Sequence, residues 1–296
     1  MRWAGDGGNM NGTGPPLVTP FDEDGNVDEP ALRRLVDWVE ERGVDFITPC
    51  GSNSEAELLT AAERARVVEV VCEAANVPVL AGTGSPGFEE AREAPARAAA
   101  AGAEAALVVT PFYYTHDEET LEAYYRDLAD VAEIPIYLYS VPAYTGTKLS
   151  PELVGRLADH PNIAGMKDSS GDVEAFTLEC RATADADFDM LVGSASVLEP
   201  ALDAGADGGV LALSNIAPGG AAEIYERHRE GDHEGAQALN ADLVPLNKAI
   251  TAKYSIPGLK YAMRQRDAPA GYVRRPHRPL DDPDAKAELD DLVADL

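Results

Sequence analysis

Short apolar runs alternate along the chain with longer stretches in which apolar residues recur at helical spacing. The runs predict β-strands that follow one another at intervals of about 20 to 30 residues. Two of them, at 106–109 and 134–138, are continuously apolar, which is typical of parallel strands buried on both faces. The eight predicted strands span residues 17–21, 46–50, 77–81, 106–111, 134–140, 163–167, 190–193 and 209–213.

Helical patterns fill the intervals, and several begin just after an Asp, Ser or Thr that can cap the helix. They include residues 29–42, 61–75, 88–101, 118–132 and 151–159. Eight strand–helix units in a row predict an α/β fold, a closed parallel (β/α)8 TIM barrel. A doubly wound open sheet is the alternative, but no G-x-G-x-x-G or G-x-x-x-x-G-K-[ST] motif follows the first strand, where such folds bind nucleotides.

The barrel is expected to occupy residues 15–230. Residues 1–14 are glycine-rich and polar and predict a flexible N-terminal tail rather than a signal peptide, and Met10 is a possible natural start. Residues 231–296 predict a helical extension packed on the barrel, with helices at 232–254, 257–266 and 284–296 and a proline-rich link at 275–283.

Charge narrows the possible partners. The chain has 52 acidic and 24 basic residues, a formal net charge of −28, and only six lysines. Such a field repels nucleic acid and anionic membranes, and it keeps a protein soluble at high salt, so we expect a halophilic host. No run approaches the about 20 apolar residues of a membrane span. Three cysteines without paired spacing indicate a reducing cytoplasm rather than disulfides or a zinc site.

In a barrel the site lies at the carboxyl ends of the strands, so the polar residues that close each apolar run are the candidates. Lys167 ends one such run and is the only lysine on a predicted strand. Burial there would favour its neutral amine, a nucleophile for carbonyl carbon. A structural pairing with Asp168 is the alternative, and position alone leaves both open.

Two neighbouring segments could complete the chemistry. Tyr139, near the end of the adjacent strand, could pass protons to and from the lysine, although core packing explains a tyrosine equally well. Gly51, Ser52 and Asn53 could hold a carboxylate through backbone N–H groups, although an ordinary capped turn is the commoner case. The five histidines never reach the spacing of a chelating pair on one helix face, so no metal is expected. The serines lack a G-x-S-x-G elbow.

Seven motifs carry a family resemblance. They are VTPF at 18–21, GSNSE at 51–55, AGTG at 81–84, TPFYY at 110–114, YSVP at 139–142, GMKD at 165–168 and IPGLK at 256–260. With them the chain resembles the dihydrodipicolinate synthase and N-acetylneuraminate lyase superfamily of class I pyruvate aldolases, from about residue 17 to 282.

The resemblance implies that Lys167 forms a Schiff base with pyruvate and that Tyr139 transfers protons. It implies that Ser52 links Tyr139 to Tyr113, which in this family reaches the site of a neighbouring subunit in a homotetramer. Ser52 and Asn53 would hold the pyruvate carboxylate. Further substrate contacts are expected from Gly51, Thr19, Ser169 and Leu211, and no cofactor is implied.

Two departures bear on the substrate. Dihydrodipicolinate synthases typically have Thr-Thr where this chain has Ser52 and Asn53, and an arginine for a substrate carboxylate where it has Tyr144, an exchange that is not conservative. We therefore expect an aldolase that cleaves a 4-hydroxy-2-oxo acid, of the 4-hydroxy-2-oxoglutarate or 2-keto-3-deoxygluconate type, to pyruvate and an aldehyde. The alternatives are the synthase reaction with aspartate semialdehyde and a non-catalytic barrel that binds 2-oxo acids. Ser54 stands where these groups usually have glycine, so the backbone of this loop is expected to differ from theirs.

Overall fold

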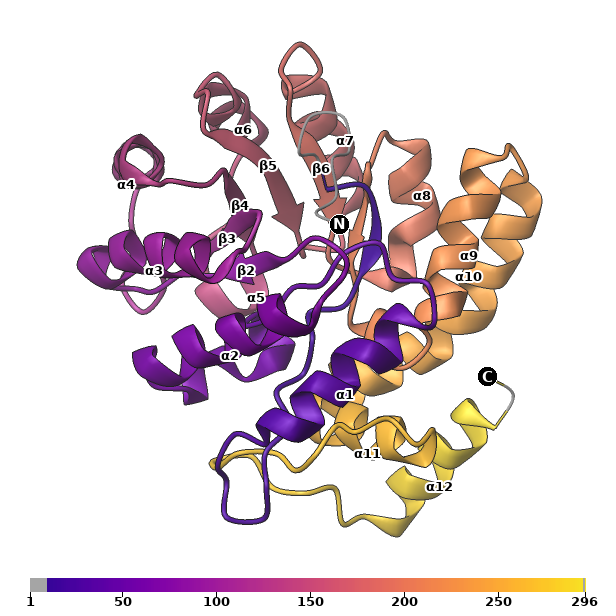
Figure 1. Ribbon diagram of the computed structural model, residues 1–296. Helices are drawn as coiled ribbons and strands as arrows, with labels where there is room; N and C mark the ends of the chain where they lie inside the picture. Colours follow the sequence, from indigo (N-terminus) through magenta and orange to yellow (C-terminus); the bar gives the residue numbers. More distant parts are fainter. Residues whose placement is uncertain (1–9, 295) are drawn as a thin grey trace.

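A computed structural model describes residues 10–294 and 296 of the chain. Its centre is a parallel sheet of seven strands in the order β1-β7-β6-β5-β4-β3-β2, surrounded by helices (Figure 1). The strands are β1 Gly12–Gly14, β2 Leu80–Gly82, β3 Ala105–Val109, β4 Ile136–Ser140, β5 Ile163–Asp168, β6 Asp189–Val192 and β7 Gly208–Val210. The predicted α/β class with a parallel sheet and helical cover is confirmed.

The first strand lies earlier in the chain than predicted. Residues 17–21 were expected to form it, but β1 is Gly12–Gly14, which pairs with β7. The expectation of a tail up to residue 14 is therefore wrong at its end, and residues 1–9 of that tail lie outside the described part. A Cβ on Gly12 would lie 2.1 Å from the Asp45 carboxylate, and one on Gly14 would lie 2.3 Å from the Phe46 carbonyl oxygen. Glycine at these positions allows the neighbouring chain segment to approach the strand closely. From composition alone, the same glycines predicted a flexible tail.

The predicted strand at 46–50 is reduced to isolated bridges. Thr48 bridges Pro16 on one side and Ile47 bridges Val79 on the other, both in parallel, between the two edge strands of the sheet. The Leu17 N–H donates to the Thr48 carbonyl at 2.9 Å. A continuous hydrogen-bonded ladder does not form here because proline has no N–H to donate, and the paired segments contain Pro15, Pro16, Pro49 and Pro78.

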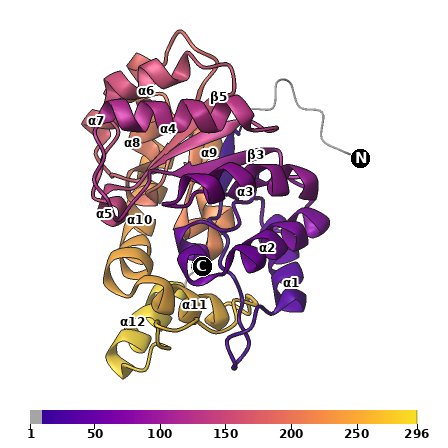
Figure 2. The same ribbon diagram turned by 90° about the vertical axis from the view of Figure 1, so that its left-hand side faces the viewer.

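Twelve α-helices occur in the described residues, most of them around the sheet (Figures 1 and 2). Local capping explains where several begin: the Asp28 side chain accepts from the Ala31 N–H, and Thr60 and Glu63 form a capping box. They are α1 Glu29–Glu40, α2 Ala61–Ala74, α3 Phe88–Ala101, α4 Glu118–Val131, α5 Pro142–Thr145, α6 Pro151–Ala158, α7 Val173–Ala182, α8 Leu198–Asp203, α9 Pro218–Arg229, α10 His233–Lys248, α11 Ser255–Gln265 and α12 Pro283–Val293.

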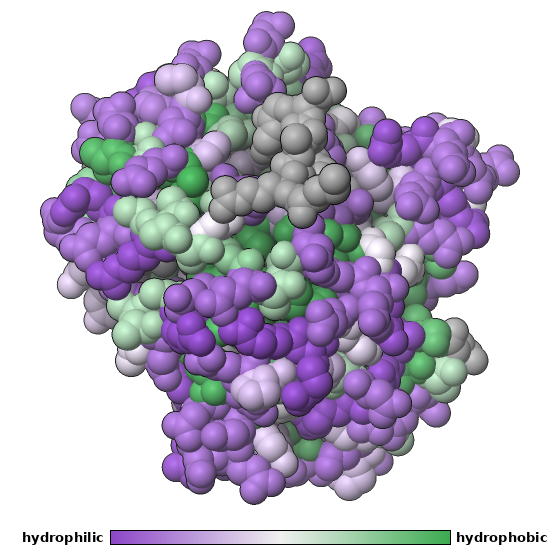
Figure 3. Space-filling view, viewed as in Figure 1, coloured by the Kyte–Doolittle hydropathy of each residue, from purple (hydrophilic) through white to green (hydrophobic). Residues whose placement is uncertain are grey.

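The C-terminal helices sit at one end of the molecule. In both views α11 and α12 lie below the sheet, and α10 leads to them along α9 (Figures 1 and 2). A π-helical turn, η6 Ala249–Lys253, separates α10 from α11. No helix among the described residues is both long and apolar enough to cross a membrane. Hydrophilic side chains cover most of the periphery of the face in Figure 3, and apolar ones gather toward its centre.

Candidate active site

Lys167 and Tyr139 face each other on adjacent strands. They are register partners of β5 and β4, and each is almost fully buried, with 3% and 5% of its surface exposed. The Lys167 Nζ lies 4.3 Å from the centroid of the Tyr139 ring. Because Asp168 follows Lys167 in a strand, its side chain points to the opposite face, where it accepts from the Ser170 hydroxyl at 2.6 Å. Lys167 forms no ion pair with any described residue, so the structural pairing with Asp168 is not observed.

The Ser52 hydroxyl joins this pair. Its Oγ lies 3.2 Å from the Tyr139 hydroxyl, in the 3₁₀ turn η2 Ser52–Ser54 that follows the segment at 46–50. Tyr113 lies apart from them: it is 87% exposed, has a φ of 79°, and stacks edge-on against Tyr114. The structure thus brings together Lys167, Tyr139 and Ser52, and it leaves Tyr113 exposed and apart from them.

Ser54 holds the loop in place. Its Oγ donates to the Leu17 carbonyl at 2.5 Å and accepts from the Gly51 N–H at 3.0 Å. The Thr19 hydroxyl donates to the Ser54 carbonyl at 2.7 Å, so this side chain, expected to touch substrate, supports the loop. The left-handed positions of the loop are Cys50 and Glu55 rather than Ser54. A serine is therefore accommodated at this position.

A buried ion pair beneath the loop escaped the sequence analysis. Lys260 on α11 and Glu55 are joined at 2.6 Å, with both side chains fully buried. The Lys260 Nζ also donates to the Thr19 carbonyl at 2.6 Å. Burial lowers the pKa of Lys260 to about 8 although Glu55 opposes the shift. The two residues close the motifs at 51–55 and 256–260, but the sequence did not link these motifs to each other.

A cavity of about 360 Å³ opens beside Tyr139. Ser52 and Tyr139 line it, α5 contributes Tyr144 at the exposed rim, and the start of α11 contributes Ile256. The C-terminal extension therefore builds part of the site. His277, from the segment before α12, also lines the cavity.

The remaining candidates lie around this centre in different ways. Asn53 is half-buried beside Ser52 in η2. Leu211 is fully buried in the main hydrophobic core, and its N–H donates to the Gly14 carbonyl at 2.8 Å. Ser169 follows Lys167 and is half-buried. Its backbone N–H donates to the Ser140 carbonyl at 2.8 Å, which ties the end of β5 to β4.

Gly193, just after β6, is a site residue that sequence reasoning did not single out. A Cβ on it would lie 1.8 Å from the Ser169 Oγ and 3.0 Å from the Lys167 Cε. Only glycine leaves room for both side chains, because the nearer contact is far inside van der Waals distance. No signal other than its place at the end of a predicted strand pointed to it.

Glu179→Gln is expected to stabilise the protein, with a gain that grows with pH. Glu179 on α7 is fully buried and neither carboxyl oxygen is hydrogen-bonded. Burial, and then the charge of Asp168, raise its pKa to about 8. Because the folded pKa exceeds the unfolded value, the native state binds more protons, and the free energy of unfolding falls between about pH 4.5 and 8.

Urea denaturation of both proteins at about pH 5 and pH 8 measures this effect. The variant should gain at most about 5 kcal/mol at the higher pH and much less at the lower one. Glu174→Gln, an exposed position on the same helix, should show no such pH-dependent difference. Equal gains at both pH values would contradict the raised pKa.

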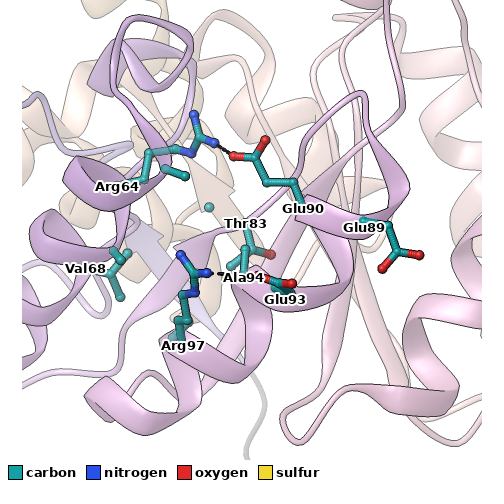
Figure 4. Close-up of a pocket in the computed structure, with 12 residues that line it drawn as sticks. Arg64, Val68, Thr83, Glu89, Glu90, Glu93, Ala94 and Arg97 are labelled. Carbon is teal, nitrogen blue, oxygen red and sulfur yellow. Dashed lines mark hydrogen bonds and ion pairs between the residues drawn. The ribbon is translucent and has the colours of Figure 1, made fainter.

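A second cavity, of about 290 Å³, lies between α2 and α3. Its charged groups are paired with one another: Arg64 and Glu90 point toward each other across one end, and Arg97 binds Glu93 at 2.9 Å (Figure 4). Because these charged groups bind each other, they are not available to bind a ligand. The cavity beside Tyr139 is therefore the candidate active site.

The chain combines a parallel α/β fold with a buried lysine at the carboxyl end of a strand, the end at which barrel enzymes carry their active sites. A model of the dihydrodipicolinate synthetase family matches residues 9–295. The chain belongs to this family, and the resemblance drawn from the motifs is confirmed. Lyase is the general enzyme class that this membership gives.

Individual relatives cover nearly the whole chain. A 4-hydroxy-tetrahydrodipicolinate synthase of Methanothrix thermoacetophila is 36% identical over 97% of this chain and 99% of its own. An uncharacterised DapA-like lyase of Halobacterium salinarum is 38% identical over 99% of this chain and 96% of its own. Among solved structures, YagE of E. coli K12, a prophage protein of the dihydrodipicolinic acid synthase family in complex with pyruvate, has a TM-score of 0.92 at 32% identity and covers 97% of this chain and 98% of that chain.

Proposed function

We propose that the chain binds pyruvate as a Schiff base on Lys167. The observation that carries this is the buried Lys167 amine against the Tyr139 ring, with the Tyr139 hydroxyl in reach of Ser52. A neutral amine attacks the C2 ketone, water leaves, and the protonated imine acts as an electron sink that yields an enamine. Tyr139 and Ser52 supply a path for the protons that these steps move.

As the reaction we propose condensation of the enamine with aspartate semialdehyde, the 4-hydroxy-tetrahydrodipicolinate synthase reaction. Curated relatives with that name at 33–37% identity support it. This reverses the order expected from the sequence, in which aldol cleavage came first. The enamine carbon attacks the aldehyde, and Tyr139 protonates the new alkoxide.

Cleavage of a 4-hydroxy-2-oxo acid is the second candidate, and one observation favours it. Tyr144 occupies the rim position at which an arginine would hold the semialdehyde carboxylate, and no described arginine lines the cavity. Glu57 lines it, and Glu55 does so while paired with Lys260. Without an arginine partner in the cavity, a substrate that has no second carboxylate, such as one of the 2-keto-3-deoxygluconate type, is favoured.

The assembly and the barrel belong to the same proposal. Exposure of Tyr113 supports its reaching the site of a neighbouring subunit, in a homotetramer of two dimers. Bridges on both sides of the segment at 46–50 support a closed (β/α)8 barrel. Retention of Lys167, Tyr139 and Ser52 in one site argues against a barrel that only binds 2-oxo acids.

Product analysis with two substrate sets tests the proposal. The purified chain is incubated at high salt with pyruvate and aspartate semialdehyde, and separately with 4-hydroxy-2-oxoglutarate or 2-keto-3-deoxygluconate, and products are followed by mass spectrometry. Formation of the cyclic condensation product supports the synthase reaction, and release of pyruvate alone supports the aldolase. Tyr144→Arg should shift the ratio toward condensation, with Tyr144→Phe as its matched control. Turnover of neither substrate set would refute both reactions.

A further inference from the structure

Four metal-ligating side chains meet where α8, α9 and α10 come together. Glu199 and Asp203 lie one turn apart on α8, His228 lies in the last turn of α9, and His233 is the first residue of α10. One ligand atom from each lies within 4.8 Å of all the others. The sequence analysis excluded chelating pairs on one helix face, but here the short turn between two helices brings the imidazoles together.

Two of the separations match a tetrahedral site, and a third is slightly longer. The His228 and His233 Nδ1 atoms are 3.3 Å apart, and the Asp203 Oδ1 lies 3.6 Å from the Nδ1 of His233 and 3.8 Å from that of His228. The edge of a tetrahedron with metal–ligand bonds of about 2.0 to 2.2 Å is about 3.3 to 3.6 Å. Small side-chain movements would therefore close these three ligands around one ion.

Glu199 supplies the floor of the site. Its surface is only 5% exposed. Among the described residues, no lysine or arginine forms an ion pair with Glu199 or Asp203. Two neighbouring carboxylates repel each other, and a divalent cation would compensate both at once.

Asn240 on α10 holds the backbone of Glu199 in place. Its side-chain oxygen accepts from the Glu199 N–H at 3.0 Å, and its amide nitrogen donates to the Ala195 carbonyl at 2.7 Å. These two bonds hold the start of α8 against α10 before any ion binds. A site that is held in place in this way loses less entropy on binding.

We propose that Glu199, Asp203, His228 and His233 bind one divalent transition-metal ion of the zinc type. Imidazole and carboxylate ligands in a tetrahedral arrangement suit this class, and the neutral imidazoles coordinate through Nδ1. Asp203 and His233 are exposed, which gives the ion a path from solvent.

The position of the site makes its role structural. Asp203 precedes β7 by a few residues, so the cluster lies toward the amino ends of the parallel strands, whereas Lys167 lies near the carboxyl end of β5. In barrels the amino-terminal face serves stability rather than catalysis. The bound ion ties α8, α9 and α10 together, and it takes no part in the reaction at Lys167.

Calorimetric titration of the tag-free full chain, stripped with chelator, measures binding of Zn²⁺, with Co²⁺ as a spectroscopic probe. We expect one ion per chain, intense visible Co²⁺ absorption typical of a tetrahedral site, and a higher Tm with Zn²⁺. His233→Ala should weaken binding by more than the about 10- to 100-fold that loss of a supporting group costs. It should also abolish the Zn²⁺-dependent Tm shift.

His160→Ala is the matched control, because His160 contacts a single carboxylate, Asp130, at 3.1 Å without a second imidazole. It should leave the stoichiometry, the spectrum and the Tm shift unchanged. Absence of saturable binding to the wild type, or equal binding to His233→Ala, would overturn the proposal. Asp203→Asn gives a second check, since it keeps the shape of the side chain and removes its charge.

Discussion

Lys167→Ala is expected to abolish the covalent trapping of pyruvate and to lower turnover by on the order of 10⁴-fold or more. Lys167 carries the amine that lies against the Tyr139 ring, and the residue is almost fully buried. Without it, neither the electron sink nor the enamine can form. Borohydride reduction in the presence of pyruvate, followed by intact and peptide mass spectrometry, measures the adduct directly.

Tyr139→Phe is the matched control for that experiment. It keeps the ring against the Lys167 amine but removes the hydroxyl that meets Ser52. Imine formation should persist at a lower rate, while turnover should fall by about 10²- to 10⁴-fold, as expected for loss of a general acid and base. An adduct on any other lysine, or unchanged turnover in Lys167→Ala, would refute the Schiff-base mechanism.

Strands whose apolar run is uninterrupted could be predicted from sequence, and those that depend on close backbone approach could not. The predicted ranges at 106–111 and 134–140 differ little from β3 and β4, because a strand buried on both faces requires apolar residues at consecutive positions. β1 is short and rich in glycine, and its partner β7 begins with glycine as well. Glycine is required at these positions because another backbone segment lies close by. The local sequence pattern carries no information about that segment.

The same limit separates the predicted from the unpredicted parts of the site. Lys167 and Tyr139 close apolar runs, so their positions followed from periodicity and the parallel register. Two features depend on contacts between separate segments: the Lys260 pair with Glu55 and the space that Gly193 leaves. The approach of His233 to His228 depends on the turn that joins α9 to α10. Residue type alone gives no hint of such partners.

Lys260→Ala is expected to lower the free energy of unfolding by about 3 to 5 kcal/mol. The substitution removes the cation at 2.6 Å from Glu55 and leaves that buried carboxylate with the Arg274 N–H, at 2.9 Å, as a donor but without a charged partner in direct contact. It also frees the Thr19 carbonyl, to which Lys260 donates. Urea denaturation at constant salt measures the loss.

The combination of Lys260→Met with Glu55→Gln distinguishes the charge from the packing. Removing both charges together should cost much less than removing Lys260 alone, because no unpaired charge then remains in the core. The double variant should nonetheless lose activity, since Glu55 ends the turn that carries Ser52 to the Tyr139 hydroxyl. If Lys260→Ala and the double variant were equally unstable, the pair would act through volume, and the electrostatic account of the loop would be wrong.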